Sequence, residues 1–164
     1  MMNMDGRKEN VYQYDSKNQP LFTIPWRIIT DNYNNIYVID CVSLESDGRV
    51  VALGQNGMVK WIYTGYSEAQ TKSYKFKPTD IVFLESYNVI VSDVEQKLLH
   101  ILDTGGQCIQ YLKTMDLGIE LPYSLKIDNE GFLIIGCNSY KRKIGAKMFA
   151  IKYYAKNNVP DLLE

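Results

Sequence analysis

Histidine, cysteine and alanine are scarce in this chain of 164 residues. Its one histidine, His100, would have to serve any Ser-His-Asp or Cys-His nucleophile system, because no second imidazole is present. The three cysteines are odd in number and far apart, which excludes a disulfide framework and the close cysteine pairs of a zinc site. We therefore expect no metal site and interpret these residues as buried thiols in a reducing compartment: Cys41, Cys108 and Cys137.

An excess of one charge sign and long apolar runs are also missing. With 18 Lys+Arg against 19 Asp+Glu, the formal charge is −1, so no global field draws the chain to nucleic acid or to an anionic membrane. No stretch approaches the roughly 18 apolar residues of a membrane span, and the N-terminus lacks the apolar core of a signal peptide. A P-loop and a G-x-G-x-x-G motif are absent as well. We expect a soluble, cytoplasmic protein without a membrane partner or a cofactor.

Residues that favour β-strands are abundant. The sequence has 13 tyrosines, 16 isoleucines and 11 valines against five alanines, and no window carries a helical stripe of apolar residues. Short apolar runs are bounded instead by Asn, Gly, Asp or Pro. This pattern predicts an all-β fold. The predicted strands include residues 11–15, 35–41, 49–54, 58–65, 80–85, 88–93, 98–103, 108–113, 123–128, 132–137 and 148–154.

Three segments align with one another without gaps. They read PWRIITDNYNNIYVIDC, PTDIVFLESYNVIVSDV and PYSLKIDNEGFLIIGCN, each a proline followed by strand, turn and strand. The fifteenth residue after the proline is Asp40, Asp93 or Cys137. After each of the first two copies comes a hairpin, for which we predict two-residue turns at Asn56-Gly57 and Gly105-Gly106.

The repeating unit therefore has four antiparallel strands. The copies begin at residues 25, 78 and 122, which gives spacings of 53 and 44 residues, typical of β-propeller blades. We expect one propeller domain with these parts: the end of a preceding blade at 1–24, blades at 25–77 and 78–121, and a last, incomplete blade at 122–164.

These segments, together with LLHILDTGGQCIQYL, resemble the NHL-repeat β-propeller, most closely the one at the C-terminus of tripartite-motif (TRIM) proteins. The resemblance runs from about residue 11 to residue 154, and the last copy departs from it where Gly136-Cys137 replaces Val-x-Asp or Val-Gly. It implies a partial propeller, about three and a half blades of a six-bladed ring of roughly 260 residues or more. Two copies closing one ring as a homodimer, or a longer chain, would complete such a ring.

The resemblance places a binding face at the strand starts after each proline and at the loops between second and third strands. It implies a non-catalytic module that binds a protein partner or a ubiquitination substrate, as in TRIM-type E3 ubiquitin ligases, although this chain lacks the Cys/His pairs of a RING domain. The candidate binding residues are Trp26, Arg27, Asp80, Tyr123, Tyr140, Lys141, Arg142 and Lys143.

Two other functions remain open. Residues 138–158 carry six basic residues and no carboxylate, and a basic loop beside Tyr140 can hold phosphates and stack a base, so single-stranded or stem-loop RNA is an alternative partner. The same loop can equally be a solvated connection. A metal-dependent hydrolase or lactonase would use Asp40 and Asp93, but carboxylates at matching repeat positions are better explained by hydrogen bonds to backbone N–H groups. We expect no enzyme activity.

Overall fold

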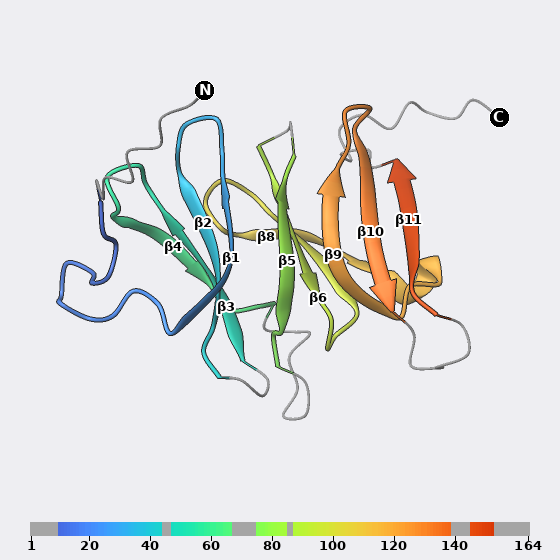
Figure 1. Ribbon diagram of the computed structural model, residues 1–164, viewed down its shortest axis with the longest axis horizontal. Helices are drawn as coiled ribbons and strands as arrows, with labels where there is room; N and C mark the ends of the chain where they lie inside the picture. The colour runs from blue at the N-terminus through green and yellow to red at the C-terminus, as the bar shows by residue number, and fades with distance from the viewer. Residues whose placement is uncertain (1–9, 44–46, 67–74, 85–86, 139–144, 153–164) are drawn as a thin grey trace, which may run out of the picture.

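The structure is a computed structural model that describes residues 10–43, 47–66, 75–84, 87–138 and 145–152. These residues form eleven strands and one short 3-10 helix, η1 (Thr114–Leu117). The strands make three antiparallel sheets that follow one another along the chain (Figure 1). The prediction of an all-β fold is therefore confirmed. Among the described residues, no helix is long and apolar enough to cross a membrane.

The first two sheets have four strands each, in the order of the sequence. In the third sheet β10 lies between β9 and β11. The first sheet contains β1 (Ile24–Thr30), β2 (Ile36–Cys41), β3 (Gly48–Leu53) and β4 (Val59–Tyr63). The second contains β5 (Pro78–Phe83), β6 (Val89–Asp93), β7 (Leu98–Leu102) and β8 (Cys108–Lys113). The third contains β9 (Leu121–Ile127), β10 (Phe132–Asn138) and β11 (Lys147–Lys152).

The three sheets repeat in register, as the aligned segments predict. Each proline is the first or second residue of its sheet's first strand, where a missing N–H costs little ladder bonding. In every sheet a register shift lies next to the proline pair. The proline pairs are Pro25 with Asp40, Pro78 with Asp93, and Pro122 with Cys137.

Two apolar cores fill the spaces between consecutive sheets. Strand β6 is buried along its whole length because its two faces serve different cores. Val89 and Val91 face the first sheet, with Ile39 and Val50 in the same cluster. Ile90 belongs to the cluster shared with the third sheet. The first strands β1, β5 and β9 contact one another in turn and lie side by side in Figure 1. Equivalent positions of the three repeats are therefore neighbours in the molecule.

The hairpin turns differ from the prediction by one position. Gly57 donates its N–H to the carbonyl of Gly54 at 2.8 Å, and Gly57 has a φ of +78°. The turn thus spans Gly54 to Gly57, with Gly57 as the left-handed residue that rejoins the ladder, and Asn56-Gly57 is not a two-residue turn. The turn from Asp103 to Gly106 has the same hydrogen bond and a φ of +80° at its glycine. A turn of this kind followed by a bulge matches the twist of the strands as well as a two-residue turn does.

The strand predicted at residues 11–15 does not form. Only an isolated bridge joins Tyr14 to Pro20, around a turn from Asp15 to Asn18. A two-stranded hairpin alone is only marginally stable in water. This segment is held instead by side chains that pack against the first sheet. Phe22 and Tyr12 pack against Leu53 and its neighbours on the first sheet.

Candidate functional site

Four residues predicted from the strand starts come together on the first strands of the three sheets. Trp26 and Arg27 lie on β1, Asp80 on β5 and Tyr123 on β9. The Arg27 guanidinium forms a two-pronged ion pair with Asp80, with Nε 2.8 Å from Oδ1 and Nη2 3.3 Å from Oδ2. Arg27 and Asp80 are 53 positions apart in the sequence, and Asp80 and Tyr123 are 43 positions apart, yet they form one patch.

Asp80 holds this patch together from beneath. Its side chain is only 5% exposed, whereas that of Arg27 is 51% exposed. The Leu125 N–H donates to Asp80 Oδ2 at 2.7 Å, so the carboxylate joins β1, β5 and β9. Since bidentate contact fixes a guanidinium in one orientation, Asp80 positions Arg27 and does not itself line the surface hollow described next.

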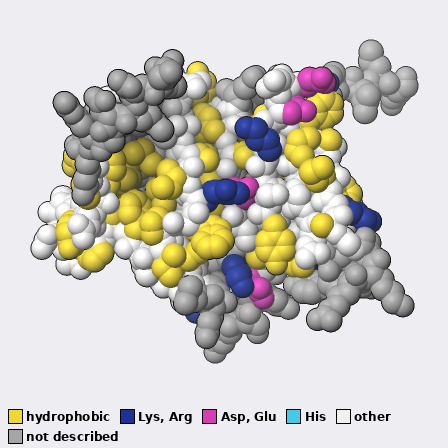
Figure 2. Space-filling model, in the orientation of Figure 1, with side chains coloured by type: hydrophobic (Ala, Val, Ile, Leu, Met, Phe, Trp, Pro, Cys, Tyr) yellow, Lys and Arg dark blue, Asp and Glu magenta, His cyan; other side chains and the backbone are white. Residues whose placement is uncertain are grey.

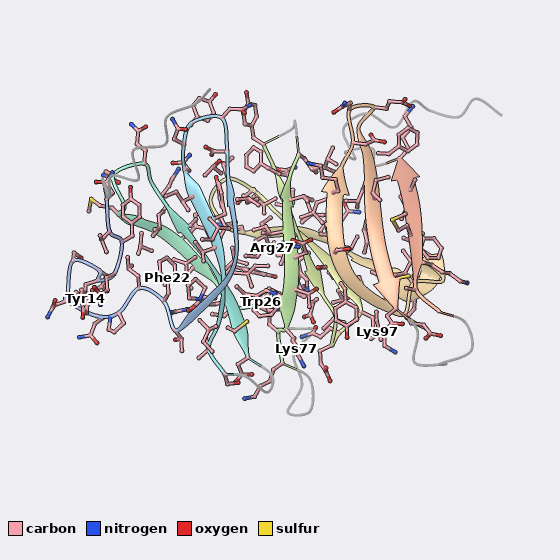
Figure 3. The ribbon with its side chains drawn as sticks, in the orientation of Figure 1. Tyr14, Phe22, Trp26, Arg27, Lys77 and Lys97 are labelled. Atoms are coloured by element: carbon pink, nitrogen blue, oxygen red, sulfur yellow. The ribbon has the colours of Figure 1, made fainter. Side chains whose placement is uncertain are left out.

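A hollow of about 500 Å³ opens beside this ion pair. Its two largest aromatic side chains are strongly exposed, Trp26 to 66% and Tyr123 to 48%. Figure 3 shows Trp26, Arg27 and Lys77 gathered at the centre of the view, where β1 and β5 meet. The hollow is lined by Ile24, Trp26, Arg27, Cys41, Ser43, Asp47, Gly48, Lys77, Pro78, Thr79 and Tyr123.

Several apolar side chains are exposed on the face around the hollow. Figure 2 shows hydrophobic side chains in several groups across it, with few charged ones between them. On β1, Ile28 is also exposed, to 60%. The charges at the rim have partners: Asp47 Oδ2 lies 2.6 Å from Lys75 Nζ, as Arg27 pairs with Asp80. Apolar contact is therefore what this surface offers most.

The two tryptophans have different roles. Trp61 on β4 donates its indole N–H to the carbonyl of Thr104 at 3.0 Å and stacks at an angle on Tyr37. It therefore joins the first sheet to a turn of the second. Trp26, in contrast, is strongly exposed at the surface, which is the arrangement expected of a contact residue.

The basic loop lies outside the described residues. Tyr140, Lys141, Arg142 and Lys143 all fall within residues 139–144. The structure therefore brings together the residues predicted from the strand starts, while the RNA hypothesis keeps its status as a prediction from sequence.

The repeat aspartates bond to the backbone. Asp40 is fully buried, and its Oδ1 accepts N–H groups from Thr23 and Ile24, each at 2.8 Å. Its Oδ2 lies 2.9 Å from the Arg49 guanidinium. Asp93 Oδ1 accepts the N–H groups of the next turn. In the part of the chain that the structure describes, no three His, Cys, Asp or Glu side chains are grouped as a metal site would need.

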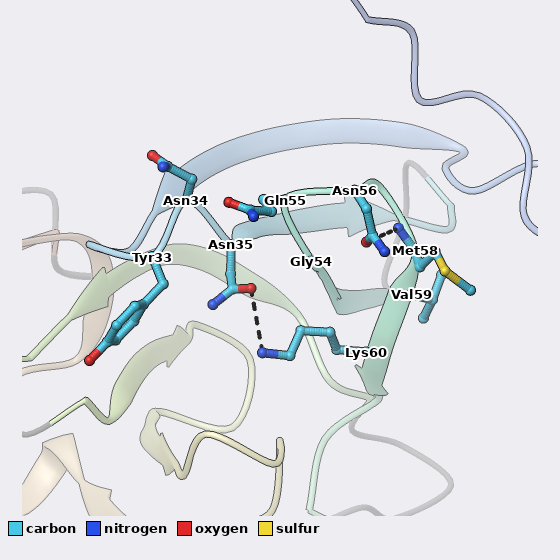
Figure 4. A pocket seen from close by; sticks show the side chains of 9 residues that line it. All are labelled: Tyr33, Asn34, Asn35, Gly54, Gln55, Asn56, Met58, Val59 and Lys60. Atoms are coloured by element: carbon cyan, nitrogen blue, oxygen red, sulfur yellow. Dashed lines mark hydrogen bonds between the residues drawn. The ribbon is translucent and has the colours of Figure 1, made fainter.

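A second hollow, of about 690 Å³, was not foreseen from the sequence (Figure 4). It lies between the β1–β2 turn and the β3–β4 turn, at one end of the first sheet. Lys60 Nζ contacts Asn35 Oδ1 at 3.4 Å across it. Its lining is mostly amides and backbone of exposed turns, with no buried polar group directed into it. The only signal in the sequence is the clustering of asparagines in these two turns.

Comparisons with known proteins leave the family open. No family model matches the chain, and no curated protein is similar to it. Among solved structures, it is similar to a crystal structure of a protein of unknown function from Bacteroides caccae, with a TM-score of 0.46 and 15% sequence identity. The match covers 82% of this chain and 51% of that one, so the chain spans about half the length of that protein.

Proposed function

We propose that this chain is a non-catalytic interaction module that binds a protein partner at the hollow flanked by Trp26 and Tyr123. The observation that carries the proposal is the exposure of these two aromatic side chains, 66% and 48%, on one hollow. Tryptophan, tyrosine and arginine dominate the binding energy of protein interfaces. Exposed apolar surface with a polar rim often marks interaction sites on soluble proteins.

The geometry favours an extended peptide or loop that inserts an apolar side chain. The hollow's apolar lining, including Ile24, Pro78 and Cys41, would receive such a side chain between the aromatic rings. Arg27 is already held in place by Asp80, so little side-chain entropy is lost when a partner carbonyl or carboxylate contacts it. Apolar insertion would supply affinity, and the rim would orient the partner.

The module would belong to a propeller of the NHL type. Three sheets with the same proline register, whose first strands lie side by side, support consecutive blades at 25–77, 78–121 and 122–164. In a TRIM-like protein, the partner would be a substrate presented to a RING domain for ubiquitination. In that arrangement, the module supplies recognition and none of the catalytic groups.

Selection from a displayed library of random dodecapeptides tests this function. Peptides that bind the wild-type chain should carry an apolar or aromatic anchor, and Trp26→Ala should weaken their binding at least about tenfold, as expected when a hot-spot aromatic is removed. Fluorescence anisotropy with a labelled peptide measures this. Tyr33→Ala is the matched control, because Tyr33 is exposed to 63% but does not line this hollow. Equal weakening by both substitutions would contradict the proposal.

A random RNA pool provides the competing outcome. Phosphate contacts weaken steeply as salt is added. RNA binding that is lost with salt and with Lys141, Arg142 and Lys143 changed to Ser, but is unaffected by Trp26→Ala, would establish the RNA module instead. If those three changes leave RNA binding intact, the RNA hypothesis is wrong.

A further inference from the structure

The third sheet ends at an open edge. Strand β11 pairs with β10 on one side, and on its other side no strand lies among the described residues. The equivalent third strands of the other two sheets, β3 and β7, are paired on both sides, with β4 and β8 as their outer strands. Unpaired N–H and C=O groups at a sheet edge can pair with a further strand. The edge of β11 can therefore accept a fourth strand.

The segment before the first sheet corresponds to an outer strand. Tyr12 lies against Gly57 as Trp61 of β4 lies against Gly106. Both residues of the first pair precede their counterparts by 49 positions, so residues 10–14 correspond to β4. In the described part of the chain, no inner strands lie beside this segment. One end of the molecule thus presents an outer strand without its sheet, and the other end presents a sheet that can accept one.

The backbone of this segment has one edge directed away from its own chain. Gln13 accepts and Asp15 donates a backbone hydrogen bond to residues 19–21, at 2.9 and 2.8 Å. Alternate residues of an extended chain direct their N–H and C=O groups to the same edge. Tyr12 and Tyr14 therefore direct theirs to the opposite edge, where a further strand can pair.

On β11, an apolar side chain is exposed at a position that the other sheets bury. Met148 is opposite the residue that lies fourteen positions after its sheet's proline, as are Val50 on β3 and Leu99 on β7. Val50 and Leu99 are each 0% exposed, whereas Met148 is 81% exposed. Met148 therefore stands where a neighbouring strand and sheet would cover it.

The segment before the first sheet has a matching exposed residue. Tyr14 corresponds to Tyr63 of β4, 49 positions later. Tyr63 is only 7% exposed and its hydroxyl lies 2.9 Å from Nδ1 of His100 on the second sheet, whereas Tyr14 is 52% exposed. In the first sheet, Tyr63 lies opposite Val50. The same register places Tyr14 opposite Met148, so one pairing would cover both side chains.

We propose that residues 10–15 of one copy of this chain pair with β11 of a second copy, antiparallel, as the fourth strand of its third sheet, and that the second copy returns the same segment. In Figure 1, residues 10–23 and β11 lie at opposite ends of the molecule, so the pairing joins two copies. The exchange depends on the equivalence of the three sheets and not on a ligand at the Trp26 hollow. If the sheets are blades, as we propose, the pair has six blades of four strands.

The charges of the two edges are complementary in this register. Leu98 lies opposite Lys113 in the second sheet. The residues at the equivalent positions of β11 and of the first segment are Lys147 and Asp15. Opposite charges directly across an antiparallel pair stabilise the pairing. A one-residue shift would lose this contact and the contact of Tyr14 with Met148.

Disulfide trapping between two single variants tests the register. Tyr14→Cys and Met148→Cys are mixed in equal amounts, left to exchange partners and oxidised, and linked peptides are identified by mass spectrometry. Opposite residues of an antiparallel pair have Cα atoms about 4.5–5.5 Å apart, within the range that a disulfide spans. We expect a covalent dimer in which the two introduced cysteines are joined. Since each variant carries only one of them, such a link joins two copies.

Lys152→Cys replaces Met148→Cys in the matched control. Lys152 is also exposed and lies on the same face of β11, four positions along the strand and thus about 13 Å from Met148. This mixture should give no link to residue 14. Equal linking in the two mixtures, or no link in either, would overturn the proposal.

Met148→Asp tests the contribution of the covered side chain. We expect the dissociation constant of the dimer to rise at least about tenfold, because a charge would replace an apolar group at a position buried in the other sheets. Met115→Asp is the matched control, since Met115 is exposed on η1, away from both edges, and it should leave the constant unchanged. Sedimentation equilibrium measures the constants, and circular dichroism establishes that the variants are folded. Equal constants for Met148→Asp and the wild type, or a monomeric wild type, would show that the copies do not exchange strands.

Discussion

Single aspartates organise several turns of this molecule in one way. Asp31, Asp103 and Asp128 each open a hairpin turn, and Oδ1 of each accepts the backbone N–H groups two and four residues further on. Aspartate is suited to this position because its short side chain reaches the N–H groups that the turn leaves unpaired. In these turns, the aspartates therefore stabilise the local backbone.

Asp31 makes folding stability depend on acid pH. Burial would raise the pKa of Asp31, but hydrogen bonds from Asn35, Tyr37 and Tyr33 outweigh burial and lower it. Its stabilising effect is therefore complete above the unfolded-state pKa of about 3.9 and is lost as pH falls through the lower pKa of the folded state.

Urea unfolding between pH 2 and 6 should show this in the wild type. Asp31→Asn should be less stable near pH 6 and should lose less stability on acidification. Asp116→Asn, at an exposed carboxyl of η1, is the control and should follow the wild type. A pH profile of Asp31→Asn parallel to that of the wild type would contradict the role given to Asp31.

Only some residues of the site could be predicted from the sequence. Trp26, Arg27 and Tyr123 follow the repeat prolines, so their position near one another was accessible from the alignment. The role of Asp80 was not, because the register shift between Pro78 and Asp80 redirects that side chain toward Arg27 and β9. The contact between Tyr63 and His100 was hidden as well, since these residues are 37 positions apart on different sheets.

At the scale of elements, an aromatic side chain of one unit packs on the glycine turn of the next. Tyr12 lies against Gly57, and Trp61 lies against Gly106. The glycine stands 45 residues after the aromatic residue in both pairs. This second repetition supports the proposal that residues before 25 take the place of a preceding blade.

Gly106→Ala should cost more stability than Gly131→Ala. Both glycines have a φ of +80°, which costs a residue with a Cβ about 1–2 kcal/mol. A Cβ at Gly106 would in addition collide with the Trp61 ring, whereas nothing lies within 4 Å of one at Gly131. Urea unfolding of the two variants measures the difference. Equal losses would show that the contact between Trp61 and the turn is not a tight one.

The elements themselves were largely predictable because each has a local cause. Strand alternation, prolines at strand starts and polar turn residues predicted ten of the strand segments, and the alignment of the three copies predicted that Pro25, Pro78 and Pro122 occupy equivalent places in the three sheets. The strand at residues 11–15 failed because its stability depends on partners that sequence alone does not supply. The predicted positions of the turns at Gly57 and Gly106 were wrong, because Asn-Gly and Gly-Gly can stand at the last two positions of a turn as well as at its centre.

At the scale of the whole molecule, three sheets in sequence make an arc with two outward faces. On the outward side of the third sheet, Met148 of β11 is 81% exposed. Open sheet faces and edges favour association with further chains. If the three sheets are propeller blades, as we propose, a second copy or additional blades would complete the ring.

Sedimentation velocity distinguishes these arrangements. A defined species of twice 18.9 kDa is the result expected if two copies close one ring. Aggregation with weakly cooperative urea unfolding would show that further blades are needed. A stable, cooperative monomer of 18.9 kDa would contradict the expectation that the open faces need a partner.

The central claim is that a protein partner binds over β1 and β9 at the hollow. Hydrogen exchange with a selected peptide bound tests it most directly, because protection is read along the whole backbone. We predict slower exchange in Ile24–Thr30 and Leu121–Ile127, with no change in the turn from Gly54 to Gly57. Protection confined to that turn, or absent from both strands, would contradict the account.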